Sequence, residues 1–292
     1  MGPFVPAGAA DPSAIRELLR RATTTDGVEP ISERFRIALA RPPALLSRGA
    51  EGECTAYGMV LDDGAAELVV DPAWRRRGIG GGLLAALREA TTVETVWAHG
   101  DLPAARGLAR HLGLTRIRTL HLMSRPLTEA EVRPPAFPDG LTLRSFRDGD
   151  EDAWLAVNAA AFAHHPEQGR VDRATLAELM RQDWFAPEDL LLLWGPDGEL
   201  AGSHWTKIDP TRTAPGPGGD APAGEVYVVA LAPRWQGRGL ALPLMSAGLA
   251  HLAEKGLATV ILYVDEENSA AMATYRRLGF ASLATDAQYA VA

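Results

Sequence analysis

Apolar and polar residues follow one another in blocks along the chain, and the same series of blocks occurs twice. In the first half, the apolar run Glu67–Pro72 predicts a short strand ending at a proline, and Leu83–Ala90 predicts an apolar helix. In the second half, Val226–Pro233 predicts a strand of the same kind and Leu242–Glu254 a helix. A glycine-containing loop joins strand to helix in both halves.

The spacing of these blocks indicates an internal duplication. Pro72 corresponds to Pro233 and Gly78 to Gly239 at one offset, 233 − 72 = 239 − 78 = 161. A second strand and helix then recur, since 93–98 leads into a helix closing on Gly113 and 259–264 into one closing on Gly279. There the offset is 279 − 113 = 166, so the second copy carries about five more residues. Two blocks that repeat in the same order predict two copies of one fold.

Each copy is expected to be a mixed α/β domain. A helical region, Pro12–Ala22 or Glu151–Phe162, precedes short strands, and the series strand, glycine loop, helix, strand, helix and final strand follows. Prolines 134, 135 and 138 predict an extended linker, which gives domains at 1–130 and 140–292 joined by 131–139. The Pro/Gly-rich stretch Asp209–Gly224 predicts a mobile loop beside a site.

Composition narrows the class of protein. The 292 residues suffice for two domains of ordinary size, and the net charge of 29 − 37 = −8 argues against a nucleic-acid-binding role. The single cysteine, Cys54, excludes an internal disulfide framework and a multi-thiolate metal site. The N-terminus lacks the basic segment of a signal peptide, and no apolar run has the length of a membrane span. We therefore expect a cytoplasmic protein without membrane or nucleic-acid partners.

The glycine loops predict a phosphate site. A strand, then Q/R-x-x-G-x-G/A, then a helix places free backbone N–H groups at a helix N-terminus, where they and the helix dipole favour a phosphate or pyrophosphate. Gly78 and Gly239 are expected at the closest approach of the phosphate, where a Cβ would interfere. The loops match neither the dinucleotide-binding nor the Walker pattern. A tight turn without a ligand is the alternative.

With these loops, the sequence resembles the GNAT N-acetyltransferase superfamily. Its pantetheine-pyrophosphate loop is matched by Arg75-x-x-Gly78-x-Gly80 and Gln236-x-x-Gly239-x-Ala241. The later Asn268…Tyr275…Leu278-Gly279-Phe280 stretch is similar to the superfamily's other cofactor-side block. The resemblance implies an α/β (α+β) fold with two tandem acetyltransferase domains. Each would have a mixed, mostly antiparallel sheet flanked by helices.

Further runs resemble the narrower mycothiol synthase family. They are Trp97–Gly100, His164–Gly169, His204–Lys207, Gly224–Val229 and Leu262–Val264. The resemblance covers the chain from about residue 10 to the C-terminus and implies a monomeric enzyme that uses acetyl-CoA as co-substrate. Its small-molecule substrate would be the cysteinyl amine of cysteinyl-glucosaminyl-inositol. In the family, Val-Gly-Val-Asp-Pro is more usual where this chain has Val229–Pro233, a departure on the cofactor side.

The reaction requires a base, an oxyanion donor and an acid. An amine must lose a proton before it attacks a thioester, and Glu225, at the start of the central strand, is the candidate base. A backbone N–H in Val229–Leu231 would bind the thioester oxygen as it becomes an oxyanion. Tyr275 is the candidate acid, because a phenol of pKa ~10 can protonate a departing thiolate during C–S cleavage. A solvated carboxylate and a packed aromatic are the simpler alternatives for these two side chains.

The duplication provides an internal comparison. At the 161 offset Glu225 falls opposite Gly64, and at the 166 offset Tyr275 falls opposite Ala109. The first copy therefore keeps the phosphate loop but lacks both proposed proton-transfer groups. We expect one turnover site per chain, in the C-terminal domain, with the first domain either holding CoA or bracing the second.

The resemblance also implies binding residues. Those on the cofactor side are Val229, Ala230, Leu231, Gln236, Gly237, Arg238, Gly239, Leu240, Ala241, Leu242, Asn268, Ala270 and Ala271, with Leu68, Val69, Val70, Arg75, Arg76, Arg77, Gly78, Ile79 and Gly80 in the first copy. Those on the substrate side are Glu33, Glu167, Lys207, Glu225 and Tyr263. No metal is expected, because the adjacent His164 and His165 point in different directions and no third ligand is suitably spaced. Trp184, Phe185 and Trp194 are most simply core residues.

Two other functions fit the sequence. One is a GNAT enzyme acting on a different amine, such as a peptide N-terminus or an aminoglycoside, which competition among amines would distinguish. The other is a non-catalytic acyl-CoA-binding module, for which Glu225→Gln would behave like wild type. The presence of Glu225 and Tyr275 in one copy alone favours an enzyme.

Overall fold

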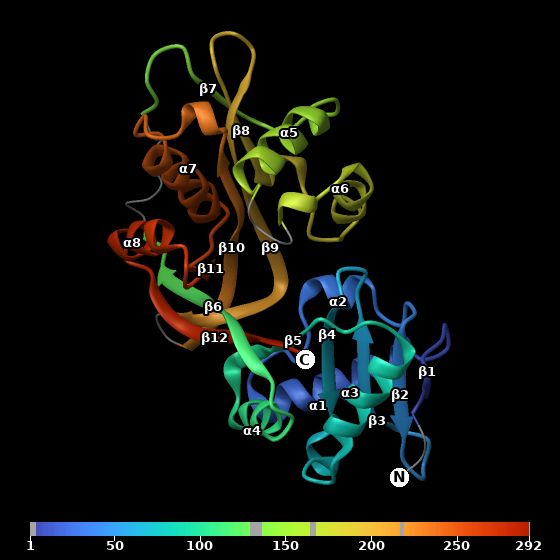
Figure 1. Cartoon of the computed structure of the whole chain (residues 1–292). Coiled ribbons are helices and arrows are strands. Elements are labelled where there is room, and N and C mark those ends of the chain that lie inside the picture. Colours follow the sequence, from blue (N-terminus) through green and yellow to red (C-terminus); the bar gives the residue numbers. More distant parts are fainter. Residues whose placement is uncertain (1–3, 129–135, 164–167, 217–218, 292) are drawn as a thin grey trace. The chain divides into compact units, whose positions relative to one another are not determined.

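The computed structural model describes residues 4–128, 136–163, 168–216 and 219–291 and divides into two compact units (Figure 1). The first unit comprises Met1–His121, Asp265–Met272 and Ala284–Ala292, and the second comprises Leu122–Val264 and Ala273–Leu283. Each unit therefore takes residues from both halves of the sequence. The predicted linker, 131–139, lies partly outside the described residues, and the predicted domain limits stay a prediction.

The first unit is a mixed, mostly antiparallel sheet with helices on both faces. Strands β1 to β4 pair antiparallel in chain order, β4 pairs parallel with β5, and the end of β12 pairs antiparallel with β5. The elements of this unit are β1 (Val5–Pro6), α1 (Pro12–Asp26), α2 (Glu33–Ile37), β2 (Ala44–Arg48), β3 (Cys54–Val60), β4 (Ala65–Val70), η1 (Pro72–Trp74), α3 (Ile79–Ala90), β5 (Thr95–Ala98), η2 (His99–Asp101), α4 (Pro103–His111) and the first part of β6 (Thr115–Pro126).

The second unit repeats this plan. Strands β7 to β10 pair antiparallel in chain order and β10 pairs parallel with β11. Its elements are β7 (Thr142–Ser145), α5 (Glu151–Ala161), η4 (Gln168–Arg170), α6 (Arg173–Leu179), η5 (Pro187–Asp189), β8 (Leu190–Trp194), β9 (Leu200–Gly216), β10 (Gly219–Leu231), η6 (Pro233–Trp235), α7 (Ala241–Glu254), β11 (Thr259–Asp265) and, in part, α8 (Ser269–Arg277) and β12 (Ala281–Ala290). The predicted mixed, mostly antiparallel sheets are confirmed.

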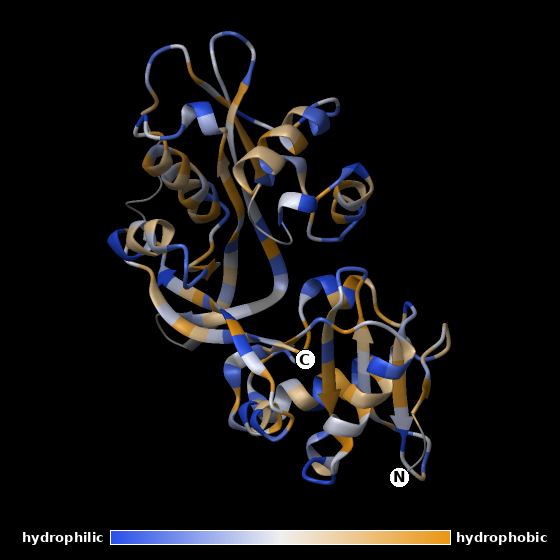
Figure 2. Ribbon diagram, in the orientation of Figure 1, coloured by the Kyte–Doolittle hydropathy of each residue, from blue (hydrophilic) through white to orange (hydrophobic). Residues whose placement is uncertain are grey.

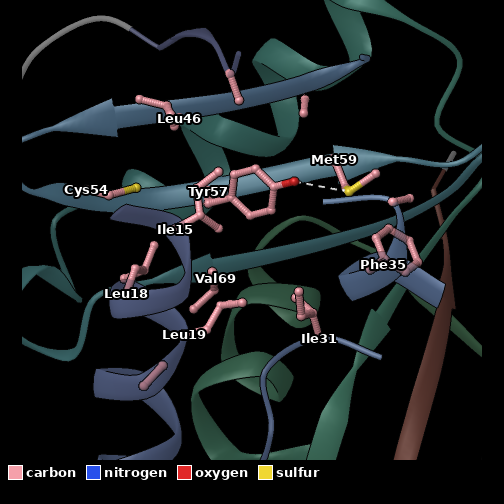
Figure 3. Close-up of a cluster of buried hydrophobic side chains, with 14 of the residues drawn as sticks. Ile15, Leu18, Leu19, Ile31, Phe35, Leu46, Cys54, Tyr57, Met59 and Val69 are labelled. Carbon is pink, nitrogen blue, oxygen red and sulfur yellow. Dashed lines mark hydrogen bonds between the residues drawn. The ribbon is translucent and has the colours of Figure 1, made fainter. Parts of the chain in front are cut away.

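Alternating side chains build a core on each face of the first sheet. Tyr57 and Met59 of β3 face α1 and α2, where Ile15 and Phe35 cover them, and the Tyr57 hydroxyl donates to the sulfur of Met59 at 3.1 Å (Figure 3). Neighbouring positions of β3 face α3 on the other side. Hydrophobic residues accordingly occupy much of β3 and β4 (Figure 2). Burial raises the pKa of Tyr57 to about 12.

The second sheet is covered in the same way. Leu190 and Leu192 of β8 pack with α5 and α6, whereas Leu193 packs with Leu244 of α7. The helices α5 and α6 therefore cover one face and α7 covers the other, as Figure 1 shows. The proposed base, Glu225, lies on β10, and the glycine loop follows that strand after η6 and leads into α7.

The prediction of a mobile loop over Asp209–Gly224 is wrong. The stretch continues β9 and β10 as a long antiparallel hairpin in which Gly216 pairs with Gly219 and Thr213 with Pro222, with a register shift before Gly224. Proline and glycine are usually turn signals, but the fixed φ of proline is compatible with extended backbone, particularly near a bulge. Composition alone therefore did not distinguish this hairpin from a loop.

A half-buried histidine joins the C-terminal strand to the first unit. The two nitrogens of His99 lie 2.9 Å from Glu67 Oε1 on β4 and 2.9 Å from Asp286 Oδ2 on β12. Glu67 also accepts from Ser32 N, and Asp286 from Gly100 N. Burial would lower the pKa of His99, but the charge and hydrogen bonds of the two carboxylates outweigh it and raise the pKa to about 10.

This histidine gives the stability of the protein a specific pH dependence. The folded-state pKa of about 10 lies above the ordinary value of 6.5, so the contribution of His99 is complete below pH 6.5 and is lost as the pH rises towards 10. We expect His99→Gln to lower the free energy of unfolding more at pH 6 than at pH 10, in urea titrations at both pH values. An equal loss at both pH values would contradict a charged His99.

Candidate active site

The glycine loops of the two copies share their hydrogen bonding. Arg75 Nε donates to the carbonyl oxygen of Val70 at 3.1 Å, and Gln236 Nε2 donates to that of Leu231 at 3.0 Å. Donors and acceptors are both related by the same offset, 236 − 75 = 231 − 70 = 161. The first residue of the motif therefore ties the loop to the end of the preceding strand in each copy.

A second contact repeats at the same offset. The guanidinium of Arg77 lies 4.9 Å from the ring centroid of Trp74, and that of Arg238 lies 4.8 Å from that of Trp235. Each tryptophan ends a short 3-10 helix, η1 or η6, that begins at a proline. Side-chain contacts thus support the duplication independently of the strand and helix order.

Glycine is required in these loops because of backbone conformation. Gly78 has φ +78° and Gly239 φ +76°, the left-handed region that residues with a Cβ rarely adopt. A Cβ built at either position would meet no protein atom within 4 Å, so crowding within the protein is not the reason. Two residues earlier, Gly237 has φ +71° and its counterpart Arg76 has φ +63°, so the first copy holds a non-glycine residue in this conformation.

The second loop exposes a helix N-terminus. Helix α7 begins at Ala241 and has no acidic residue in its first turn, and the preceding residues Gln236–Gly239 are exposed while Leu240 is buried. The first N–H groups of an α-helix have no intrahelical partner, and the helix dipole adds positive potential there. This arrangement suits a pyrophosphate group.

Strand β10, which leads to this loop, separates from its neighbour β11 before it ends. The parallel pairing of β10 with β11 covers Ala223–Val226, whereas β10 itself continues to Leu231. A bulge at Tyr227 shifts the register with β9 at the point where the pairing with β11 stops. Beyond the bulge, one edge of Val229–Leu231 faces away from β9, and a chain of amides such as pantetheine can pair with such an edge.

Glu225 lies next to this separation. It is 9% exposed, pairs with Ile261 of β11 and stands opposite Lys207 of β9, which is 5% exposed. Residues directly opposite on adjacent strands point to the same face with Cβ atoms about 5 Å apart. The Glu225 and Lys207 side chains therefore start from neighbouring positions on the face that α5 and α6 cover.

Tyr275 and Asn268 lie on or beside α8. Tyr275 packs edge-on against Phe280 at 5.9 Å between ring centroids, and burial raises the pKa of its phenol. The side-chain oxygen of Asn268 accepts from Ala271 N at 3.1 Å, so Asn268 caps the start of α8. Its visible role is structural, and a cofactor contact stays a prediction.

The raised pKa of Tyr275 gives a test of its proposed role. A phenol whose pKa lies above 10 keeps its proton through neutral and mildly alkaline pH. We expect Tyr275→Phe to lower kcat by about 100-fold, the lower end of the range for a lost general acid, with little change in acetyl-CoA affinity. The wild-type rate should show no decline attributable to Tyr275 below pH 10. Initial rates of CoA release from pH 6 to 10 measure both effects, and a variant with the wild-type kcat would exclude Tyr275 as the acid.

The first copy differs at both positions that the sequence offsets give. Gly64 lies in the turn before β4 with φ +74°, and a Cβ there would lie 2.8 Å from Glu94. Ala109 is buried in α4, with 4% of its surface exposed. The turn therefore cannot accept a glutamate without rearrangement, and the helix presents a methyl group where α8 has a phenol.

The remaining predicted residues are distributed over both units. Tyr263 lies on β11 and is 36% exposed, Glu33 begins α2 in the first unit, and Glu167 lies outside the described residues. Ala270 lies in the first turn of α8, and Leu242 in that of α7 is 54% exposed. In the first copy, Leu68, Val69 and Val70 end β4, Arg75, Arg76 and Arg77 form the loop, and Ile79 and Gly80 begin α3. Their roles as ligands stay predictions.

Neither a metal site nor a membrane span is found in the described part of the chain. There, no group of three or more His, Cys, Asp or Glu side chains is arranged to hold a metal ion. His164 and His165 lie outside the described residues. None of the helices within 4–128, 136–163, 168–216 and 219–291 is long and apolar enough to cross a bilayer.

Comparison with known proteins agrees with this architecture. Residues 154–280 match the acetyltransferase (GNAT) family. The structure is similar to a GCN5-related N-acetyltransferase from Sphaerobacter thermophilus (TM-score 0.70, 24% identity, 98% of this chain and 95% of that one). It is also similar to a tandem GNAT protein from the clavulanic acid biosynthesis pathway (TM-score 0.69, 21% identity, 99% and 97%). At these identities the structures establish the fold alone.

The fold and the glycine loop together define a GNAT acetyltransferase, an enzyme that takes its acetyl group from acetyl-CoA. Curated relatives narrow this class. The mycothiol acetyltransferase of Tsukamurella paurometabola is 44% identical over 99% of both chains, and that of Kytococcus sedentarius is 43% identical over 96% of this chain and 93% of its own. The chain belongs to the mycothiol acetyltransferase family.

Proposed function

We propose that this enzyme acetylates the cysteinyl amine of cysteinyl-glucosaminyl-inositol, a small-molecule substrate, and so forms mycothiol. The similarity to mycothiol acetyltransferases over nearly the whole chain carries the proposal. The position of Glu225 supports it further, because this buried carboxylate lies where β10 leaves β11, beside the edge suited to pantetheine. The acetyl donor and the base would then act on the same part of β10.

The reaction proceeds by direct attack in a complex of enzyme, acetyl-CoA and amine. The substrate ammonium first loses one proton to solvent, and Glu225 accepts the second as the amine nitrogen attacks the thioester carbon. A backbone N–H within Val229–Leu231 donates to the oxyanion of the tetrahedral intermediate. The C–S bond then breaks, and the CoA sulfur takes the proton of Tyr275. The products are the amide and CoA.

The binding groups are assigned on the same basis. The loop Gln236–Leu242 holds the pyrophosphate at the N-terminus of α7, and Asn268, Ala270 and Ala271 line the cofactor side at the start of α8. Lys207 and Tyr263 hydrogen-bond the sugar–inositol part of the substrate. The roles of Glu33, in the first unit, and of Glu167, outside the described residues, stay predictions. The first copy's loop, Arg75–Gly80, takes no part in turnover.

A product assay tests the proposal. The purified protein is incubated with acetyl-CoA and cysteinyl-glucosaminyl-inositol, CoA release is followed, and the product mass is measured. One acetyl group on the cysteinyl nitrogen, formed with kcat/KM well above that for a peptide N-terminus or an aminoglycoside, is expected. CoA release with another amine but not with this substrate would show that the proposed substrate is wrong. Tight CoA binding without turnover on any amine would contradict the proposal that the protein is an enzyme.

A further inference from the structure

The ammonium group of Lys207 lies over two aromatic rings. Its Nζ is 4.5 Å from the ring centroid of Trp184 and 5.3 Å from that of Tyr227, and 5% of the residue is exposed. A buried ammonium is costly unless other groups compensate its charge, and the face of an indole ring does so well. Trp184 and Tyr227 therefore provide a negative surface under this cation.

These rings are themselves fixed by packing. Trp184 lies 5.1 Å from Tyr227 and 5.9 Å from Trp205, between ring centroids. Trp205 is fully buried and contacts Trp154, Phe185 and Tyr227 edge-on at 5.4 to 5.7 Å. A ring held on several sides has little freedom to turn, so the position of the Lys207 ammonium is restricted as well.

Lys207 also stands directly opposite Glu225 across the β9–β10 pair. A cation fixed beside a carboxylate favours its ionised form and limits its rotamers, and a base needs both properties before it can take a proton. We propose that Trp184 is a positioning residue for acetyl transfer, which acts by holding the Lys207 ammonium against Glu225. The proposal rests on the role proposed for Glu225, and it extends Trp184 beyond the purely structural role expected from its sequence.

A double-mutant cycle tests this coupling in the full-length enzyme. Trp184→Leu removes the ring face and is expected to lower kcat about 10- to 30-fold, with the KM for acetyl-CoA unchanged. This factor corresponds to the loss of one desolvated cation–π contact. Trp184→Phe keeps a ring face and should retain kcat within about threefold of wild type. If Trp184 acts through the lysine, Trp184→Leu has no further effect on kcat in a Lys207→Met background.

A matched control separates positioning from folding. Trp194 also lies under a cation, with the Arg144 guanidinium 4.7 Å from its ring centroid, at the far end of β8. Trp194→Leu should leave kcat unchanged, and circular dichroism with thermal unfolding compares the folding of all variants.

The outcomes distinguish this proposal from the proposed function. If the wild-type enzyme turns over but the kcat losses of Trp184→Leu and Lys207→Met are additive, the positioning role is overturned and the proposed function stands. The same holds if Trp184→Phe lowers kcat as much as Trp184→Leu. If Trp184→Leu does not fold, the Phe variant and its cycle with Lys207→Met decide. Absence of wild-type turnover on every amine would instead contradict the proposed function.

Discussion

Glu225→Gln is expected to lower kcat for acetyl transfer by about 10²- to 10⁴-fold, the usual contribution of a general base. Glutamine keeps the size and hydrogen-bonding capacity of the side chain but cannot accept a proton from the amine. Because Glu225 precedes the edge of β10 proposed for pantetheine, the dissociation constant of acetyl-CoA should stay within about twofold of wild type. Initial-rate assays of CoA release and calorimetric titration with acetyl-CoA measure the two quantities.

Glu254→Gln is a suitable control for this variant. Glu254 is the exposed last residue of α7, so the same chemical change there should leave both kcat and acetyl-CoA binding unaltered. A Glu225→Gln enzyme as fast as this control would show that another group takes the proton.

Gly239→Val is the second substitution with a large expected effect. A β-branched residue at φ +76° is strained by about 1–3 kcal/mol, and relief of that strain would move the N–H groups at the start of α7. We expect kcat/KM for acetyl-CoA to fall by about 10- to 100-fold, chiefly through KM.

The first copy offers the matched variant, Gly78→Val. Gly78 has φ +78° at the same point of the duplicated loop, and a Cβ is equally unobstructed there. The two substitutions should therefore lower the melting temperature similarly, while Gly78→Val leaves turnover near wild type. Equal losses of activity in steady-state assays would show that turnover depends on both loops and would contradict a single site.

The features that depend on residues close together in the sequence could be predicted, namely the helix positions and the duplication. Apolar periodicity and turn residues placed α3 and α7 to within a few residues, and the paired offset of 161 identified a duplication that the Arg75 and Gln236 hydrogen bonds repeat. The GNAT fold and acetyl-CoA chemistry followed from the resemblance carried by these loops, and they are confirmed. The roles of Glu225 and Tyr275 stay predictions.

Pairing between strands that lie far apart in the chain could not be predicted from local sequence patterns. Nothing local to residues 287–290 shows that they pair with β5 in the first unit, or that His99 meets Asp286. The bulge at Tyr227 depends on how two strands match rather than on one of them. Trp184 resembles any core tryptophan in the sequence. Its contact with Lys207 becomes visible once the fold brings the segment after α6 together with β9 and β10. The hairpin over 209–224 was missed because its prolines resemble those of a loop.

A crystal structure of the enzyme with CoA and the cysteinyl substrate would show whether Glu225 reaches the substrate nitrogen. We expect the pyrophosphate on the backbone N–H groups of Gly237–Ala241 and the substrate nitrogen within about 3 Å of a Glu225 carboxylate oxygen, or joined to it by one water. A substrate amine bound beyond the reach of Glu225, with CoA properly seated on α7, would contradict this expectation.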